Sequence, residues 1–288
     1  MSFVVFAWTA SIIYAFTAIL AKFISKYQLK NVFQYSFFMI LFSAIFSGII
    51  ALVNGATLPT NWTFVILSGL FLSLANVLYL TVLKKIDVSV MSPLLNFRTV
   101  ITVILSFIIL GEKLNPQNIL IMFVILIAGM FATMDEKFSL KSFFSKSIGL
   151  GLIFILVYAI QNIFVNKAVA SNSYWTEILW MGIFASLFSF IFLYSKFKID
   201  VLRSKLSDYF GVITLSFFGT FGDLAAYKAF SGNVGISTII ISLPLSMILV
   251  FIFALWKPNL LEKHTVKVYV VRFIATGIMI LGALKLSM

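Results

Sequence analysis

Two charged side chains lie deep within long apolar runs of this sequence, and both have chemistry suited to binding a ligand. Arg98 lies in the run 88–110 and Asp223 in the run 209–230, roughly 15 Å and 22 Å from the starts of these runs if they are helical. A guanidinium is a planar, permanently charged fork that matches carboxylate or phosphate. A carboxylate at such depth can bind an ammonium group or carry a proton. Because a charge at the bilayer centre costs about 2.5–3.5 kcal/mol on insertion scales, we expect both residues to face a bundle interior or a water-filled cavity.

A buried ion pair between Arg98 and Asp223 is the alternative interpretation. Their α-carbons differ in predicted depth by only about 7 Å, which an extended arginine side chain can span. Asp223 also lies near Gly219 and Gly222, small residues that allow helices to approach closely, and near Lys228 at the end of the same run. Ligand binding and pairing both remain open at this stage.

Uncharged polar and aromatic side chains within the runs are further candidates for a binding site. Amides can bind a substrate or form hydrogen bonds between helices, and tyrosines suit a metabolite pocket and helix packing equally. By contrast, we expect Glu177 and Arg272, which lie near the ends of runs, to be solvated or interfacial. The candidate residues are Asn76, Asn96, Gln161, Asn162, Tyr14, Tyr79, Tyr158 and Tyr227.

The composition predicts an integral membrane protein that crosses the membrane many times. Of 288 residues, 62% are hydrophobic and only 10% are charged, whereas about a quarter of the residues of a soluble domain are charged. The first run, 3–21, lacks a preceding basic region and a following small-residue cleavage site, which indicates a retained span. The net charge of +12 comes mainly from connectors between runs, so we expect no nucleic-acid partner.

No residue pattern in the chain indicates an enzyme. There is no cysteine, and the one histidine, His264, lies in a charged loop. The sequence also lacks a glycine-rich phosphate loop, a nucleophile with a base, and a carboxylate cluster. We therefore expect no catalytic residue, no metal site and no cofactor.

Apolar stretches of about 20 residues cross a bilayer as helices, and the sequence predicts ten of them with no soluble domain. Connectors after the odd-numbered spans carry fifteen Lys and Arg residues, and those after the even-numbered spans carry two. This asymmetry predicts cytoplasmic odd connectors and both termini outside, and we expect the plasma (inner) membrane of a prokaryote. The predicted spans are 3–21, 32–53, 62–83, 88–110, 118–134, 148–166, 175–194, 209–230, 234–256 and 268–286.

A polar connector at 135–147 divides the chain into halves of five spans each, 1–134 and 148–288. Because five is odd, the second half must insert upside down relative to the first, as in the inverted repeats of secondary transporters. The halves share an ordered set of features: a Tyr-Ala pair followed by a lysine in their first spans, and an internal proline in their fourth spans. These are Tyr14-Ala15 with Lys22, Tyr158-Ala159 with Lys167, and the prolines Pro93 and Pro244.

Two further segments complete a resemblance that covers essentially the whole chain. The turn 83–89, LKKIDVS, leads into the fourth span, and 110–114, LGEKL, follows it. With the Tyr-Ala-Lys pattern, these segments resemble the EamA-like transporters of the drug/metabolite transporter superfamily. The resemblance implies an all-α membrane protein of two inverted five-helix repeats, with the first, third, fourth, sixth, eighth and ninth helices around a central cavity and the fifth and tenth as scaffold. Arg98 departs from the family pattern, because a proline is usual near that place.

The expected function is that of a secondary active transporter of a small polar metabolite. Arg98 would hold an anionic group and Asp223 an ammonium or a proton, so an amino acid or related zwitterion satisfies both. Nucleotide sugars, phosphorylated metabolites and S-adenosylmethionine-like compounds are alternative substrates. A coupled proton or an exchanged metabolite is the expected second partner, besides the lipid bilayer. A non-transporting scaffold or lipid-handling protein is the alternative from another class.

Overall fold

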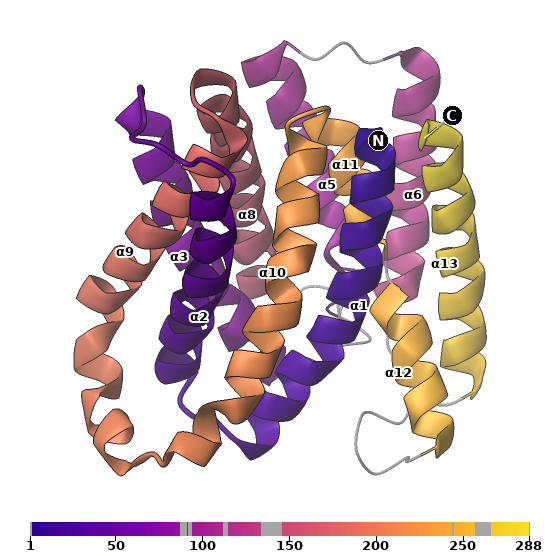
Figure 1. The fold of residues 1–288 in the computed structure, drawn as a ribbon. Helices are drawn as coiled ribbons and strands as arrows, with labels where there is room; N and C mark the ends of the chain where they lie inside the picture. Colours follow the sequence, from indigo (N-terminus) through magenta and orange to yellow (C-terminus); the bar gives the residue numbers. More distant parts are fainter. Residues whose placement is uncertain are drawn as a thin grey trace.

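The computed structural model describes residues 2–86, 91, 94–111, 115–133, 146–243, 245–256 and 266–287. Within these ranges the chain is all helical and contains no strand (Figure 1). Six helices are long and apolar enough to cross a membrane, with mean hydropathies from 1.3 to 2.4. The predicted all-α membrane fold is therefore confirmed.

Each of the ten predicted spans overlaps at least one helix of the structure. Asparagine and serine side chains begin several of them: the Asn31 carboxamide accepts from the backbone N–H of Phe33, and Ser173 caps the helix that begins at Tyr174. The helices are α1 (Phe3–Tyr27), α2 (Val32–Val53), α3 (Trp62–Lys85), α5 (Asn96–Leu105), η1 (Ser106–Leu110), α6 (Pro116–Thr133), α8 (Lys146–Ser171), α9 (Tyr174–Arg203), η2 (Leu206–Tyr209), α10 (Phe210–Phe230), α11 (Val234–Ile241), α12 (Leu245–Trp256) and α13 (Val266–Ser287).

Neither the fourth nor the ninth span is one continuous α-helix; the sequence has an internal proline in each, Pro93 and Pro244, and a proline can kink or open a membrane helix. The ninth span consists of two helices, because α11 ends at Ile241 and α12 begins at Leu245. In the fourth, α5 continues into the π-helix η1, and Gly111 follows with φ +68°, a conformation that glycine adopts without steric cost. The residues Pro93, Glu112, Lys113 and Pro244, on which the sequence comparison of these spans rests, lie outside the described residues.

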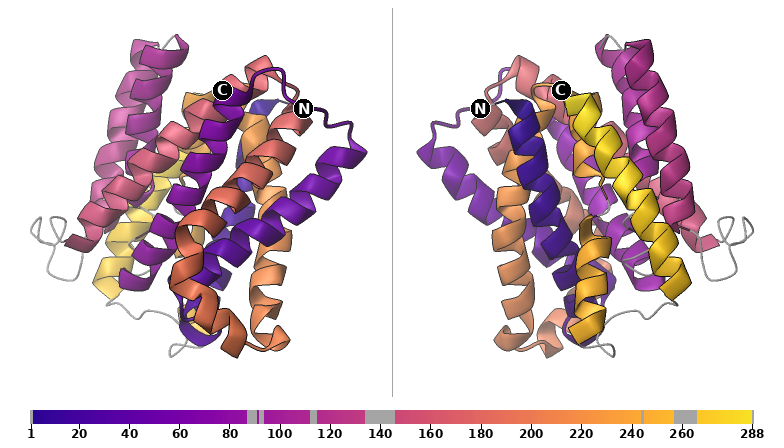
Figure 2. Two further views of the ribbon diagram at one scale, coloured as in Figure 1. Left: turned by 90° about the vertical axis from the view of Figure 1, so that its left-hand side faces the viewer. Right: turned by 90° about the vertical axis from the view of Figure 1, so that its right-hand side faces the viewer.

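Helices from the two halves of the chain pair with one another (Figures 1 and 2). The helix α1 packs along α10 and α3 along α8, while α2 pairs with α9 and α6 with α13. Glycines allow close approach: a Cβ at Gly182 would lie 3.1 Å from the Ala44 Cβ, and one at Gly69 only 2.7 Å from the Phe184 Cβ. Both termini lie at the same end of the bundle, as an even number of crossings requires (Figures 1 and 2).

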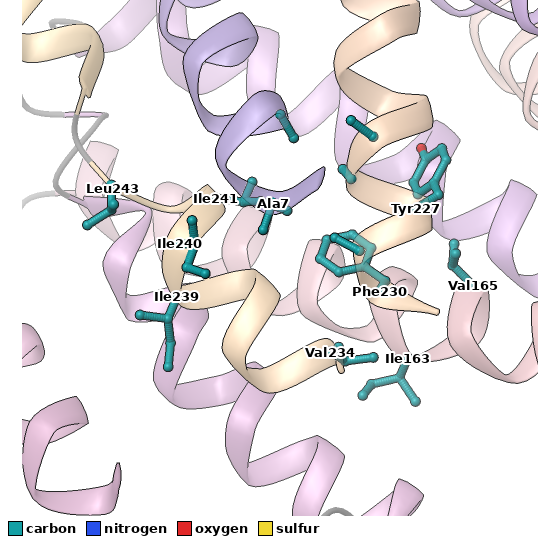
Figure 3. Close-up of a cluster of buried hydrophobic side chains, with 14 of the residues drawn as sticks. Ala7, Ile163, Val165, Tyr227, Phe230, Val234, Ile239, Ile240, Ile241 and Leu243 are labelled. Carbon is teal, nitrogen blue, oxygen red and sulfur yellow. The ribbon is translucent and has the colours of Figure 1, made fainter. Parts of the chain in front are cut away.

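The largest hydrophobic cluster lies toward the end of the bundle that carries the termini. Figure 3 shows part of it, where Tyr227 and Phe230 of α10 lie with Ile163 and Val165 of α8. Many large apolar side chains outside the clusters are exposed, among them Leu120 at 67%. A lipid-facing surface accounts for this exposure, since soluble proteins rarely expose contiguous apolar surface on this scale. The boundary segment 135–145 lies outside the described residues, so the division into two repeats stays a prediction.

Candidate functional site

A cavity of about 200 Å³ lies between the helices of both halves. Its walls come from α1, α2, α3 and α5 of the first half and from α8, α9, α10 and α11 of the second, together with Leu95 immediately before α5. No residue of α6 or α13 in the described part of the chain lines it, and these two helices pack against each other. This arrangement agrees with the scaffold role that the resemblance implies for the fifth and tenth spans.

Arg98 and Asp223 both line this cavity, and each is in contact with a tyrosine. The guanidinium carbon of Arg98 lies 4.5 Å from the centre of the Tyr158 ring, a cation–π distance. The Tyr14 hydroxyl donates a hydrogen bond of 2.6 Å to Oδ1 of Asp223. Arg98 is only 2% exposed, and its Nε has no hydrogen-bond partner among the described residues. Arg98 and Asp223 form no ion pair with each other in this part of the chain, so the buried-pair interpretation is not the arrangement present here.

The two tyrosines occupy equivalent places in the two halves. Tyr14 on α1 and Tyr158 on α8 are the tyrosines of the repeated Tyr-Ala pair. Gly222 positions the first of them, because a Cβ at Gly222 would lie 3.0 Å from Cε1 of the Tyr14 ring. Close packing of α1 on α10 thus brings the Tyr14 hydroxyl to Asp223.

The remaining predicted residues separate into those at the cavity and those beyond it. Asn76, Tyr79 and Tyr227 line the cavity, and Oδ1 of Asn76 accepts a hydrogen bond of 2.9 Å from the Ser36 hydroxyl. The Asn96 side chain lies outside the described residues. Seven of the ten predicted residues therefore meet at one cavity: Tyr14, Asn76, Tyr79, Arg98, Tyr158, Asp223 and Tyr227.

Gln161 and Asn162 do not line the cavity. Both are fully buried, and the Gln161 amide nitrogen lies 3.7 Å from the sulfur of Met181. Asn162 follows Tyr158 by four residues and shares its helix face, but it is not among the residues that line the cavity. A shared helix face with Tyr158 is therefore not sufficient to place Asn162 at the cavity.

The prediction that Glu177 and Arg272 are solvated or interfacial is wrong. Glu177 is 0% exposed and Arg272 only 1% exposed. Glu177 lies in the first turn of α9, where the Ser68 hydroxyl of α3 contacts its carboxyl group. The hydroxyl of Thr176, the residue before Glu177, accepts a hydrogen bond from the backbone N–H of Thr57. Helix α3 and the connector after α2 therefore cover this helix end.

Four hydroxyl residues that were not predicted also line the cavity. Three of them donate to a backbone carbonyl of their own helix, as Thr220 does to Ser216. Serine and threonine are common in membrane helices for this reason, so no sequence signal distinguished these positions. The residues are Thr17, Ser43, Ser47 and Thr220.

Comparisons with known proteins agree with this architecture. Residues 1–134 match the model of the EamA-like transporter family. No curated protein matches the chain. A solved structure titled "Crystal structure of protein" is 14% identical, with a TM-score of 0.63 over 96% of this chain and 95% of that chain; at this identity the likeness shows the fold alone. The match of residues 1–134 agrees with the resemblance drawn from the motifs in the first half of the chain, and with the apolar helices it supports an integral, multi-pass membrane protein.

Proposed function

We propose that this protein is a secondary transporter that moves a small zwitterionic metabolite, best an amino acid, by alternating access. One observation carries the proposal: one cavity presents a cation and an anion, Arg98 and Asp223, and in the described part of the chain each contacts a tyrosine and they form no ion pair with each other. An α-amino acid bears the complementary carboxylate and ammonium groups close together. Its binding would compensate both buried charges.

The energetic reason is the cost of a charge without a partner in a site of low dielectric. Burial of an ionised group is repaid only when a partner of opposite charge and hydrogen bonds satisfy it. Tyr158 and Tyr14 supply part of that compensation, through a ring face and one hydroxyl. The Arg98 fork remains suited to a carboxylate in a bidentate contact.

Cavity size and charge count favour this class over the alternative substrates. A volume of about 200 Å³ is below the roughly 300–1,000 Å³ typical of pockets for drug-sized ligands. A nucleotide sugar or phosphorylated metabolite carries several negative charges, and Arg98 is the one cationic side chain among the described residues that line the cavity. An S-adenosylmethionine-like compound is larger than a free amino acid and fits this volume less well.

Two contacts at opposite ends of the bundle support alternating access (Figure 1). Near the end of α1, the Lys22 ammonium donates to the carbonyl oxygens of Leu83 and Ile86 at 2.7 and 2.9 Å. Near the end of α8, the Asn166 amide donates to the Phe230 carbonyl at 2.8 Å. Lys22 and Asn166 each follow the tyrosine of the repeated pair by the same number of residues, and they bond the carboxyl ends of α3 and α10. We infer that the two contacts open in turn.

Counterflow in proteoliposomes tests the proposal. Vesicles are loaded in turn with pooled amino acids, nucleotide sugars or phosphorylated metabolites, and uptake of trace labelled members of the same pool is measured. We expect exchange of amino acids, lost in Arg98→Ala and Asp223→Asn and retained in Asp200→Asn, a carboxylate change at the far end of α9 outside the cavity. Unchanged exchange in both cavity variants would contradict the assignment of Arg98 and Asp223 to the substrate site. Absence of exchange with every pool would favour the scaffold or lipid-handling alternative.

A further inference from the structure

A second carboxyl group lies buried outside the cavity and has no role in the substrate site described above. Oε1 of Glu177 lies 2.6 Å from the Ser68 hydroxyl, and Oε2 has no hydrogen-bond partner among the described residues. The side chain is 0% exposed. A carboxylate in such surroundings, with one neutral donor and no cation, is strongly disfavoured relative to the neutral acid.

The distances between oxygen atoms at Ser68 fit a protonated Glu177. The Ser68 hydroxyl lies 2.9 Å from the Val65 carbonyl oxygen as well as 2.6 Å from Glu177. A hydroxyl has one proton to donate, so it satisfies only one of these two acceptors. If Ser68 donates to the Val65 carbonyl, Glu177 supplies the proton of the shorter contact, and both contacts are hydrogen bonds.

No described cation compensates a charge on Glu177. The two nearby lysines are engaged with rings: the Lys167 ammonium of α8 lies 5.5 Å from the Phe64 ring centre, and the Lys228 ammonium of α10 lies 5.1 Å from the Tyr174 ring centre. Neither forms an ion pair with Glu177 in the described part of the chain. Among the described residues, the polar groups that interact with Glu177 are the Ser68 hydroxyl of α3 and Tyr227 of α10.

Tyr227 connects this carboxyl group to the substrate cavity. It lines the cavity, and it lies close enough to both Asp223 and Glu177 to interact electrostatically with each. The next residue after Glu177, Ile178, also lines the cavity. The buried carboxyl group therefore lies near a cavity-lining tyrosine whose hydroxyl can accept and donate a proton.

We propose that Glu177 is a proton-binding site that couples proton movement to transport, a role that rests on the proposed transporter function. The protonated acid is the form held in the present arrangement. When the contacts between α3 and α9 open, the O–H bond breaks, the proton passes to water, and the carboxylate remains at the amino end of α9, where the helix dipole favours a negative charge. Reprotonation from the other side of the membrane restores the neutral form.

Two kinds of transport separate this role from substrate binding. Exchange of substrate at equal pH requires no net proton movement, whereas accumulation driven by a pH gradient does. We expect Glu177→Gln, which preserves the contact with Ser68, to retain counterflow and to lose accumulation driven by the gradient. Asp200→Asn, the matched change at the other end of α9, should retain both. Gradient-driven accumulation by Glu177→Gln at the wild-type level would overturn the coupling role while leaving the transporter function intact.

An infrared measurement tests the site without any substrate. A protonated carboxylic acid has a carbonyl-stretch band that an ionised carboxylate lacks, and we expect the purified protein at neutral pH to show this band. The band should disappear in Glu177→Gln and persist in Asp200→Asn. If the wild-type protein shows no band that depends on Glu177, the carboxyl group is ionised and the proposal fails, whatever the outcome of the transport assays.

Discussion

The position of Tyr14 depends on the absence of a side chain at Gly222, and replacement of this glycine by alanine tests that dependence. The new Cβ would lie 3.0 Å from Cγ2 of Ile13 and 3.0 Å from Cε1 of Tyr14. Both distances are shorter than ordinary van der Waals contacts, so α1 must move away by a few tenths of an ångström. Overpacking of this kind costs about 1–3 kcal/mol.

Movement of the Tyr14 ring also lengthens its 2.6 Å hydrogen bond to Asp223. Hydrogen bonds to charged groups contribute about 1.5–3 kcal/mol, so partial loss of this bond adds to the overpacking. We therefore expect Gly222→Ala to lower the apparent melting temperature by roughly 2–10 °C, given about 2–4 °C per kcal/mol for larger domains. The matched control is Gly219→Ala, one turn earlier on α10, where a Cβ meets no atom within 4 Å.

Thermal unfolding of the detergent-solubilised protein, followed by tryptophan fluorescence, measures this difference. The Gly219→Ala protein should melt close to the wild type, and Gly222→Ala clearly below it. In a Tyr14→Phe background the effect of Gly222→Ala should shrink, because the hydrogen bond to Asp223 is already absent. Equal melting temperatures for the two alanine variants would refute the close α1–α10 packing from which the site was built.

Two further contacts give predictions of measurable size. The buried hydroxyls of Ser73 and Ser189 share a hydrogen bond of 2.8 Å between α3 and α9. Ser73→Ala should lower the free energy of unfolding by about 1–3 kcal/mol, because the Ser189 hydroxyl is left without this partner. In a double-mutant cycle measured by thermal unfolding, the double alanine variant should recover part of that loss. Lys22→Met removes the ammonium group that bonds the carboxyl end of α3. The loss of about 0.3–2 kcal/mol should increase labelling of a cysteine introduced at this end of α3, and unchanged labelling would exclude this contact as a closure.

The helices of the fold could be predicted from properties that are visible along the linear sequence. Span length, charge asymmetry of the connectors and the repeated Tyr14-Ala15 and Tyr158-Ala159 pairs gave the helices and their order. The breaks in the fourth and ninth spans were less accessible. Pro244 lies in the sequence between the end of α11 and the start of α12, and an internal proline can open a membrane helix. The extent of this break and the π-helix η1 depend on backbone hydrogen bonds that neighbouring helices make tolerable, and apolar composition does not determine them.

The charged candidate residues were the easiest to identify from the sequence, because burial of a charge costs the most free energy. Arg98 and Asp223 were identifiable because charges within apolar runs are rare and must face the interior, and both line the cavity. Asn162 shares a helix face with Tyr158 and does not line the cavity, because helical spacing fixes a face and not how far along the helix a cavity extends. Glu177 was misjudged because the cover over the start of α9 comes from α3 and the connector after α2, residues distant in sequence.

The central claim is that Arg98 and Asp223 bind the two charges of one zwitterion. Its most direct test compares competition of counterflow by an exchanged amino acid, by its amide, which lacks the carboxylate, and by its analogue without the amino group. In the wild type both analogues should compete poorly. Arg98→Gln should reduce discrimination against the amide by roughly 10- to 150-fold, which corresponds to the loss of about 1.5–3 kcal/mol for a charged hydrogen bond. Asp223→Asn should reduce only the discrimination against the analogue that lacks the amino group. Unchanged preference for the zwitterion in both variants would contradict the assignment of these two residues to the substrate.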